Sequence, residues 1–121
     1  VEDVARELGT VAHVERLRRT AAGPFDGARA RTLADLESLR EAGGEAALDA
    51  TLLPPDEALR HWPAVQVGLA ERAWLLQGQP VFAAGPGGAQ VRMYGPDGDF
   101  LGVGQMSEEG RRLAPARLMV T

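Results

Sequence analysis

Hydrophobic positions in the first part of the chain follow a helical spacing and then a strand-like one. A helix is predicted over residues 1–8, where apolar residues recur three and four positions apart: Val1, Val4, Ala5 and Leu8. Gly9 stands where a C-terminal cap glycine would end this helix. Residues 11–19 predict a strand, which Gly23 and Pro24 terminate. Because the sequence opens inside a predicted helix, we expect it to be part of a longer protein.

The middle of the chain predicts two short helices. The first spans residues 33–41, with Thr32 as its N-cap and Asp35 completing a variant of the capping box. Its apolar stripe consists of Leu33, Leu36 and Leu39. A pair of glycines at 43 and 44 closes this helix, and the second is expected over residues 45–52.

A proline-flanked connector, "LLPPDEALRHWP", follows these helices. Leu59 and Trp62 are too apolar for a free tether, so we expect the connector to pack against the segment that follows. The domain boundary is expected near Pro63.

Beyond Pro63 the pattern changes to short strands separated by glycine-rich turns. The strand candidates are "AVQVGL", "PVFAAG", "AQVRMYG", "DFLGVGQM" and "RLAPARLMV". One helix, "AERAWLLQG", interrupts them and ends at Gly78. "GPDGD" predicts a type I turn with Gly98 in the left-handed conformation, and "SEEGR" repeats this arrangement with Gly110. We therefore expect a small, partly open β-barrel.

The composition is that of a globular chain, with 45% hydrophobic and 25% charged residues. No apolar run approaches the length of a bilayer span, and the absence of cysteine excludes disulfides and thiolate metal sites. The net charge of −4 argues against a generally basic nucleic-acid binder. The excess acid lies in residues 26–62, however, and every basic residue is an arginine.

No catalytic centre emerges from the residues alone. "HVE" at residues 13–15 has the start of a zinc-deaminase motif but no cysteine to complete it, and "GPGG" at residues 85–88 lacks the lysine of a phosphate-binding loop. His13 and His61 are expected to be structural. We expect Trp62 and Trp74 in the core or at a domain interface. The residues by themselves predict a helical segment, a small β-barrel and RNA contact through arginines.

The segment "LGTVAHVERLRRTAAGPF" resembles the end of the catalytic domain in the bacterial tRNA pseudouridine synthase B family. The resemblance continues through "LLPPDEAL", "GQPV", "VRMYGPDGDFLGVGQM" and "GRRLAPARLMV", so it covers nearly all of the chain in order. One departure is Val11, which stands where the family usually has glycine.

The resemblance implies an α+β protein in three parts. Residues 1–25 would be the tail of a mixed α/β catalytic domain, residues 26–62 a helical connector, and residues 63–121 a PUA-like pseudo-β-barrel that binds RNA. The family is a cytoplasmic isomerase that converts a T-loop uridine of tRNA to pseudouridine without a cofactor. The implied partner is tRNA, through its T arm and acceptor stem. We expect a monomer that does not bind membranes, although the isolated piece could self-associate.

The family's aspartate nucleophile lies in a Gly-x-Leu-Asp type of motif that this sequence lacks. The nucleophile role is therefore given to none of Asp3, Asp26, Asp35, Asp49, Asp56, Asp97 and Asp99. The parent protein is expected to be an enzyme, and this chain alone is expected to be inactive.

Site residues carry over from the resemblance at a few positions. Leu17 corresponds to an apolar residue that packs beside the target uridine. Arg18 and Arg19 follow it, and one of them would face the cleft or the RNA, because neighbouring strand residues point to opposite faces. The alternative is that both arginines are solvated or paired with Glu7 and Glu15. RNA contacts of the barrel are expected at Gly78, Arg92, Arg111, Arg112 and Arg117.

A function from another class stays open at this point. The barrel could be a non-catalytic module that binds protein rather than RNA, which the acidic middle and the two tryptophans would favour. Arginines gathered on one face of the barrel, and affinity that falls with salt, would favour RNA.

Overall fold

The computed structural model describes residues 1–119, which form two compact units, Val1–Ala30 and a second from Arg31 onward. Helix α1 (Glu2–Glu7) opens the first unit, as predicted. It ends in a Schellman motif, in which the Gly9 N–H donates to the Arg6 carbonyl at 3.0 Å and the Thr10 N–H to the Ala5 carbonyl at 2.9 Å. Gly9 has φ +66°, so the predicted cap glycine is confirmed.

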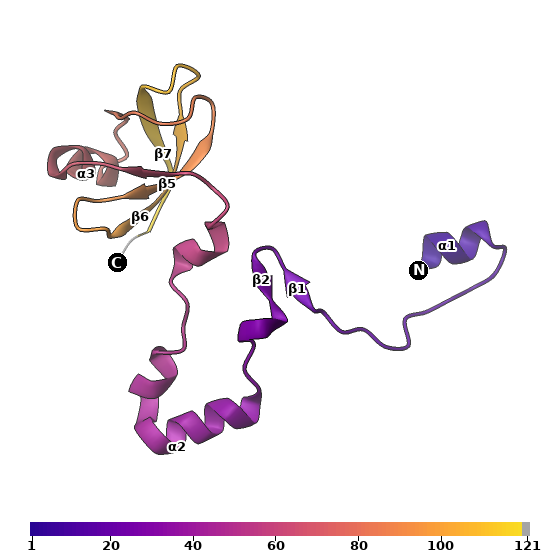
Figure 1. Cartoon of the computed structure of the whole chain (residues 1–121). Coiled ribbons are helices and arrows are strands. Elements are labelled where there is room, and N and C mark those ends of the chain that lie inside the picture. Colours follow the sequence, from indigo (N-terminus) through magenta and orange to yellow (C-terminus); the bar gives the residue numbers. More distant parts are fainter. Residues whose placement is uncertain (120–121) are drawn as a thin grey trace. The chain divides into compact units, whose positions relative to one another are not determined.

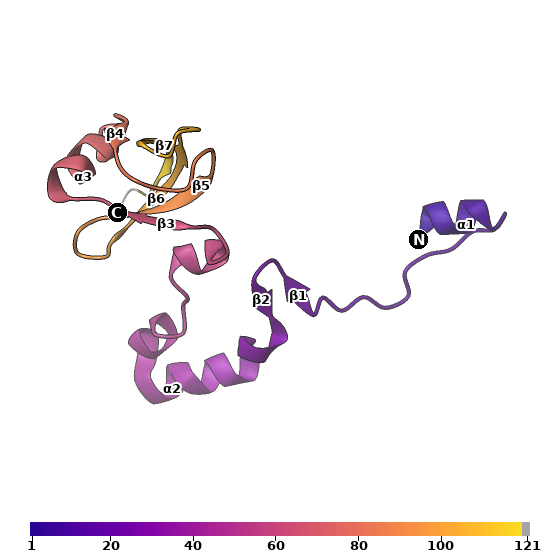
Figure 2. The same ribbon diagram turned by 45° about the horizontal axis from the view of Figure 1, so that its top comes forward.

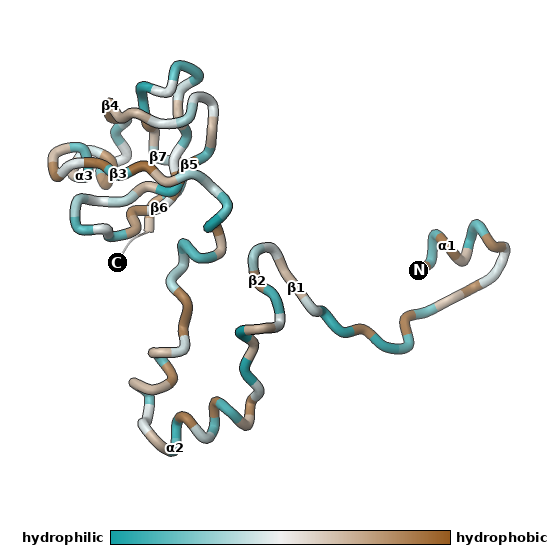
Figure 3. The backbone as a smooth tube through the Cα atoms, viewed as in Figure 1, coloured by the Kyte–Doolittle hydropathy of each residue, from teal (hydrophilic) through white to brown (hydrophobic). Residues whose placement is uncertain are grey.

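The strand predicted over residues 11–19 is wrong. Residues 11–20 have no regular secondary structure, and every one of them is exposed. Figure 3 shows that this stretch mixes hydrophobic and hydrophilic residues along the chain. Val11, Val14 and Leu17 are spaced three apart, not two, and no strand of this unit pairs with them to form a ladder.

A two-residue hairpin follows that the sequence reading missed. β1 (Ala21–Ala22) pairs antiparallel with β2 (Phe25–Asp26), and Gly23 and Pro24 form the loop. Gly23 has φ +56°, which suits the first central position of a tight hairpin turn. A single 3₁₀ turn, η1 (Gly27–Arg29), closes the unit, capped by the Asp26 carboxylate.

Helix α2 (Leu33–Asp49) contains the helix predicted over residues 33–41 and most of the one predicted over residues 45–52, because it ends at Asp49. Thr32 and Asp35 form the predicted capping box: the Thr32 N–H donates to Asp35 Oδ2 at 2.9 Å, and the Asp35 N–H donates to Thr32 Oγ1 at 3.2 Å. The Thr32 hydroxyl also donates to Asp35 Oδ2 at 2.7 Å, and this bond, followed by that from the Thr32 N–H, lowers the pKa of the Asp35 carboxyl. Gly44, with φ +64° and ψ −155°, kinks the helix where its two halves meet. The connector then forms the 3₁₀ turn η2 (Pro55–Leu59).

The rest of the second unit is a curled, mixed sheet of five strands with one helix (Figures 1 and 2). In chain order the elements are β3 (Ala64–Gln66), α3 (Leu69–Leu76), β4 (Val81–Phe82), β5 (Gln90–Tyr94), β6 (Phe100–Met106) and β7 (Arg112–Leu118). The strand order is β3-β5-β6-β7-β4. β3 runs parallel to β5, and the other pairs are antiparallel. The predicted strands and the α+β class are thus confirmed, except that Val120 of the last predicted strand lies outside the described residues.

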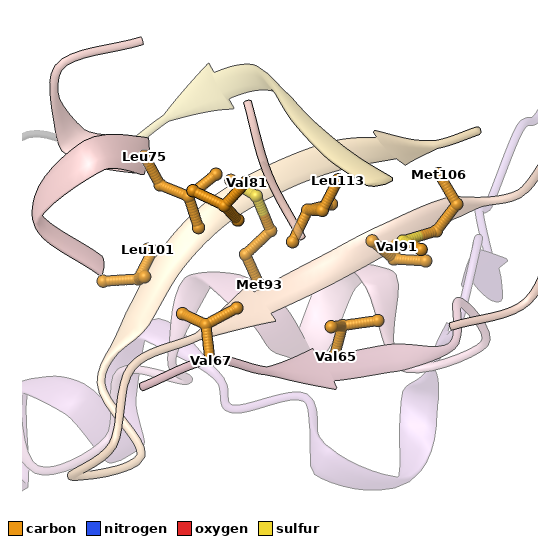
Figure 4. Close-up of a cluster of buried hydrophobic side chains, with 9 residues drawn as sticks. All are labelled: Val65, Val67, Leu75, Val81, Val91, Met93, Leu101, Met106 and Leu113. Atoms are coloured by element: carbon orange, nitrogen blue, oxygen red, sulfur yellow. The ribbon is translucent and has the colours of Figure 1, made fainter. Parts of the chain in front are cut away.

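Nine apolar side chains fill the inside of the curl (Figure 4). They come from β3 to β7, from the residue that follows β3 and from α3: Val65, Val67, Leu75, Val81, Val91, Met93, Leu101, Met106 and Leu113. Leu75 is the buried residue of α3 and is fully enclosed. The Arg72 guanidinium also ties α3 to the turn before β6 through a 2.9 Å bond to Asp99.

Turn glycines set the lengths of the hairpins as the sequence predicted. In "GPDGD" the Gly98 N–H donates to the Gly95 carbonyl at 3.1 Å, with φ +81° at Gly98. In "SEEGR" the Gly110 N–H donates to the Ser107 carbonyl at 2.9 Å, with φ +67° at Gly110.

At Gly102 of β6, both the backbone conformation and the lack of space for a side chain require glycine. Its φ is +126°, and a Cβ atom there would overlap the Arg117 carbonyl oxygen of β7. Only glycine meets both conditions, because side chains disfavour this φ and the neighbouring backbone cannot move aside without breaking the ladder.

We expect Gly102→Ala to lower the free energy of unfolding by about 3 kcal/mol or more, through backbone strain and overlap with β7. Gly98→Ala is the matched control, because it also has a positive φ but no atom within 4 Å of its would-be Cβ. It should cost only about 1 kcal/mol. Urea unfolding followed by tryptophan fluorescence measures both, and equal losses would contradict the assigned close approach of β7.

Candidate nucleic-acid interface

The outer face of the sheet, defined as the face opposite the nine-residue core, carries polar side chains. Along β5, Val91 and Met93 point into the core, so the alternate residues Gln90, Arg92 and Tyr94 point outward. The ladder places Arg92 beside Val103 of β6, and Val103 beside Arg117 of β7. Arg92 and Arg117 therefore flank Val103 on the outer face.

A β-bulge determines which β7 residues reach this face. Val103 and Gly104 of β6 are consecutive, but their partners in β7 are Arg117 and Pro115, so Ala116 is an extra residue. Leu113 is buried and Arg112 exposed, which puts Arg112 on the outer face as well. Arg92, Arg112 and Arg117, which the sequence analysis predicted as RNA contacts, thus share the outer face.

Arg111 precedes β7 and lines a shallow hollow with Phe82, Ala83 and Ala84. It follows the acidic turn residues Glu108 and Glu109. Within residues 1–119, however, the side chains of Arg111, Arg112 and Arg117 form no ion pair, and all three are exposed. Their charges are therefore available to an anionic partner.

Arg92 is different, because its guanidinium is bound by other groups of the chain. Its Nε donates to the Trp62 carbonyl at 3.0 Å, and its Nη1 donates to the Tyr94 hydroxyl at 3.1 Å. The Tyr94 hydroxyl in turn donates to the Asp56 carboxylate at 2.5 Å. We name Asp56, Trp62, Arg92 and Tyr94 the connector latch. It confirms that the connector packs against the strands that follow.

The connector latch also changes the pKa of Tyr94. Desolvation raises the pKa of Tyr94, because burial disfavours the charged phenolate. The hydrogen bond to Asp56 raises it further, because the neutral hydroxyl donates to the carboxylate and a phenolate could not. The ring packs on Phe100 with centroids 5.5 Å apart. The sequence analysis did not predict this cluster, because Asp56 and Tyr94 are separated by 38 positions and no local pattern links the two segments that contain them.

Gly78 has a clear structural role at the end of α3. Its φ is +78°, and its N–H donates to the Leu75 carbonyl at 2.9 Å while the Gln79 N–H donates to the Trp74 carbonyl. This is a second Schellman motif. An RNA contact at Gly78 stays a prediction.

In the first unit, Leu17, Arg18 and Arg19 are exposed, with Leu17 86% accessible. No ion pair joins either arginine to Glu7 or Glu15 in the part of the chain that is described, so both are solvated. The roles expected for these three residues stay predictions.

Trp74 lies outside the core, contrary to one of the two expectations for it. Its side chain is 55% exposed on α3, where the adjacent Leu75 takes the buried position. Phe82 of β4 is 82% exposed, because its neighbour Val81 faces inward. Sequence reading did not single out Phe82, although strand alternation next to a buried Val81 would have indicated its exposure.

Neither a metal cluster nor a bilayer-spanning helix is found in residues 1–119. Three aspartates of the second unit have structural partners: Asp35 accepts from Thr32, Asp56 from Tyr94, and Asp99 from Arg72. The exposed arginines therefore remain the main candidate chemistry of this unit.

Two family models match consecutive parts of the chain. Residues 1–60 match the model described as tRNA pseudouridylate synthase B C-terminal domain, and residues 63–119 match that described as pseudouridine synthase II TruB, C-terminal. Among curated proteins, the chain is 48% identical over 120 residues to tRNA pseudouridine synthase B of Stutzerimonas stutzeri and 46% identical over 122 residues to that of Ectopseudomonas mendocina. These matches cover 98% and 100% of the chain, but only 39% and 40% of the relatives.

Solved structures share the fold. An H/ACA ribonucleoprotein bound to a substrate RNA containing 2′-deoxyuridine matches with a TM-score of 0.72 at 22% identity, over 99% of this chain and 45% of that one. A chain of an archaeal box H/ACA ribonucleoprotein complex matches with a TM-score of 0.68 at 23% identity, over 98% and 46%.

Tyr94→Phe should weaken the connector latch and alter the alkaline pH dependence of stability. A raised folded-state pKa gives stability that is complete below the unfolded pKa of about 10 and is lost as pH rises through the folded pKa. Tyr94 is the only tyrosine, and the chain has no lysine or cysteine, so this loss should disappear in Tyr94→Phe. Below pH 9 the variant should be about 1 kcal/mol less stable.

Urea midpoints measured from about pH 8 to pH 11 test this expectation, and tyrosinate absorbance gives the Tyr94 pKa directly. Asp56→Asn is the companion variant, since it keeps the hydroxyl but removes the carboxylate and should lower the Tyr94 pKa. A pKa at the ordinary value in the unmodified chain would contradict the latch.

Proposed function

Because this chain belongs to the tRNA pseudouridine synthase B family, whose C-terminal domains it matches, we propose that it is the RNA-docking part of a synthase that isomerises a uridine of tRNA to pseudouridine. The chain spans about two-fifths of the curated relatives it matches. The activity, substrate and partners of a whole synthase are therefore part of the proposal.

The observation that carries the proposal is the set of exposed, unpaired arginines on and beside the outer face. Arg112 and Arg117 lie on this face, and Arg111 stands next to them. A-form RNA is bound through its phosphates and 2′-hydroxyls across a wide minor groove, so a few arginines on a rigid sheet suit it. Arg92 contributes by holding the connector, which leaves its charge less available to RNA.

The division of labour follows the family resemblance. Residues 63–121 would dock on the acceptor stem and T arm, residues 26–62 would connect, and residues 1–25 would complete a catalytic domain. The two family matches meet between residues 60 and 63, which supports a boundary near Pro63. Such an enzyme would act on cytoplasmic tRNA, as a monomer.

Leu17 would form one wall of the uridine site, with Arg18 or Arg19 facing the RNA. Its 86% exposure supports this assignment, because a large apolar side chain without a neighbour is available to a flipped-out base or to the rest of a catalytic domain. Extraction of the base from the stacked loop is required, since the glycosidic bond is otherwise inaccessible.

RNA binding by this chain should be weak and strongly salt-dependent. The Arg112→Gln/Arg117→Gln double variant should bind a tRNA T-arm and acceptor-stem RNA less tightly and reduce the slope of log affinity against log salt by about 0.9 for each phosphate that is no longer neutralised. Arg40→Gln is the control, since it removes one exposed charge from α2, away from the sheet.

Fluorescence anisotropy at several salt concentrations measures these slopes. If Arg40→Gln weakens binding as much per charge as the double variant, the outer face has no special role. Association that is insensitive to salt would favour the alternative function, a protein-binding module. The exposed side chains of Trp74 and Phe82 are the observation that supports this alternative.

The chain alone should form no pseudouridine. The reaction breaks the bond from C1′ to N1 and makes one from C1′ to C5, so the C5 hydrogen is released, and this needs the family's aspartate nucleophile, whose motif the sequence lacks. Release of tritium from tRNA labelled at uridine C5 measures turnover. Release above that of a no-protein blank would contradict the absence of a catalytic aspartate.

A further inference from the structure

The connector latch consists of individually weak contacts at the surface of the sheet. The Arg92 guanidinium has two acceptors there, the Trp62 carbonyl and the Tyr94 hydroxyl, and both are neutral. Its central carbon also lies 5.7 Å from the centroid of the Tyr94 ring, within the range of a cation–π contact. Arg92 and Tyr94 are only half-buried, so water competes with each of these contacts. A stronger acceptor that reaches the outer face can therefore displace them.

A phosphate group is such an acceptor. Hydrogen bonds from arginine to an anion are about twice as strong as those to a neutral oxygen, and one phosphate can accept two of them at once. Arg92 has no ion-pair partner among residues 1–119. Arg117 lies two strands away across Val103, which is about 10 Å at the strand spacing of a sheet. RNA held by Arg117 would thus bring its phosphates within reach of Arg92.

The connector latch also contains a negative charge that RNA would repel. The Tyr94 hydroxyl that accepts from Arg92 donates to the Asp56 carboxylate, so a phosphate bound to Arg92 would lie close to that carboxylate. Like charges at short separation destabilise each other, whereas the latch places the carboxylate near a cation. Because Asp56 belongs to η2, this repulsion would act on the connector itself.

We propose that the connector latch and an RNA phosphate are alternative partners of Arg92, so that docking of RNA on the outer face releases the connector from the sheet. This inference rests on the proposed function, because the displacing ligand is the RNA that the outer face binds. The coupling is reciprocal, since a change that opens the latch must favour RNA by the same factor. The segment from Asp56 to Trp62 would be fixed in the free chain and released in the RNA complex.

Hydrogen exchange of the unmodified 121-residue chain tests the release and needs no variant. The backbone N–H groups of Glu57, Arg60 and Trp62 donate to carbonyls within the connector. With saturating T-arm and acceptor-stem RNA they should exchange about fivefold faster than without it, at the lower end of the usual range of couplings. A ligand that only stabilises the fold would slow their exchange instead. Amides of the β5–β6 ladder should not accelerate, which would show that the sheet stays intact.

Tyr94→Phe opens the latch without changing any charge, so it should bind the same RNA about fivefold more tightly. This effect should act through Arg92. In an Arg92→Gln background, Tyr94→Phe should leave RNA affinity unaltered, which completes a double-mutant cycle. Gln90→Ala is the matched control, because Gln90 is an exposed outer-face residue of β5 outside the latch. It should neither speed exchange in the connector nor tighten binding.

Connector amides that slow down or do not respond to RNA would overturn the coupling and leave RNA docking on the outer face standing. Equal or weaker RNA binding by Tyr94→Phe would also overturn it, because Tyr94 would then not oppose RNA. Absence of RNA binding at low salt would overturn both the coupling and the proposed function.

Discussion

The inside of the curled sheet has to exclude water, and the second unit is organised around this constraint. Nine apolar side chains meet there, and Leu75, Val91, Met93 and Leu113 are completely enclosed. Because strand residues alternate between faces, filling the inside leaves the intervening residues on the outside. Arg92, Arg112 and Arg117 are therefore on the outer face as a direct result of which of their neighbours are buried.

The connector depends on the same sheet. Arg92 and Tyr94 are outward residues of β5, and they bind the connector through the Trp62 carbonyl and the Asp56 carboxylate. The outer face thus has two roles that compete for its side chains. Arg92 holds the chain together, whereas the arginines of β7 stay available to an external partner. A sequence alone ranks these arginines equally, and only the fold separates them.

How far the sequence predicts the structure depends on how local the determining interaction is. The capping box at Thr32 and the turn at Gly98 involve residues three or four apart, and both were predicted correctly. The strand over residues 11–19 needed a partner that its own pattern could not supply, and it was wrong. The bond between Asp56 and Tyr94 joins two distant positions, so no local pattern indicates it. Exposure of Trp74 likewise depends on which face of α3 the sheet covers.

The bulge at Ala116 bears on how this strand can change in evolution. Removing or adding one residue in a regular strand exchanges its two faces, which would move buried residues to the surface and charges into the core. Ala116 is already surplus to the pairing, and Pro115, Arg117 and Leu118 would keep their faces if it were deleted. β7 can therefore lose one residue at the bulge without an arginine being turned inward. Differences in length among related sheets should accumulate at this position, while the rest of the strand diverges by substitution.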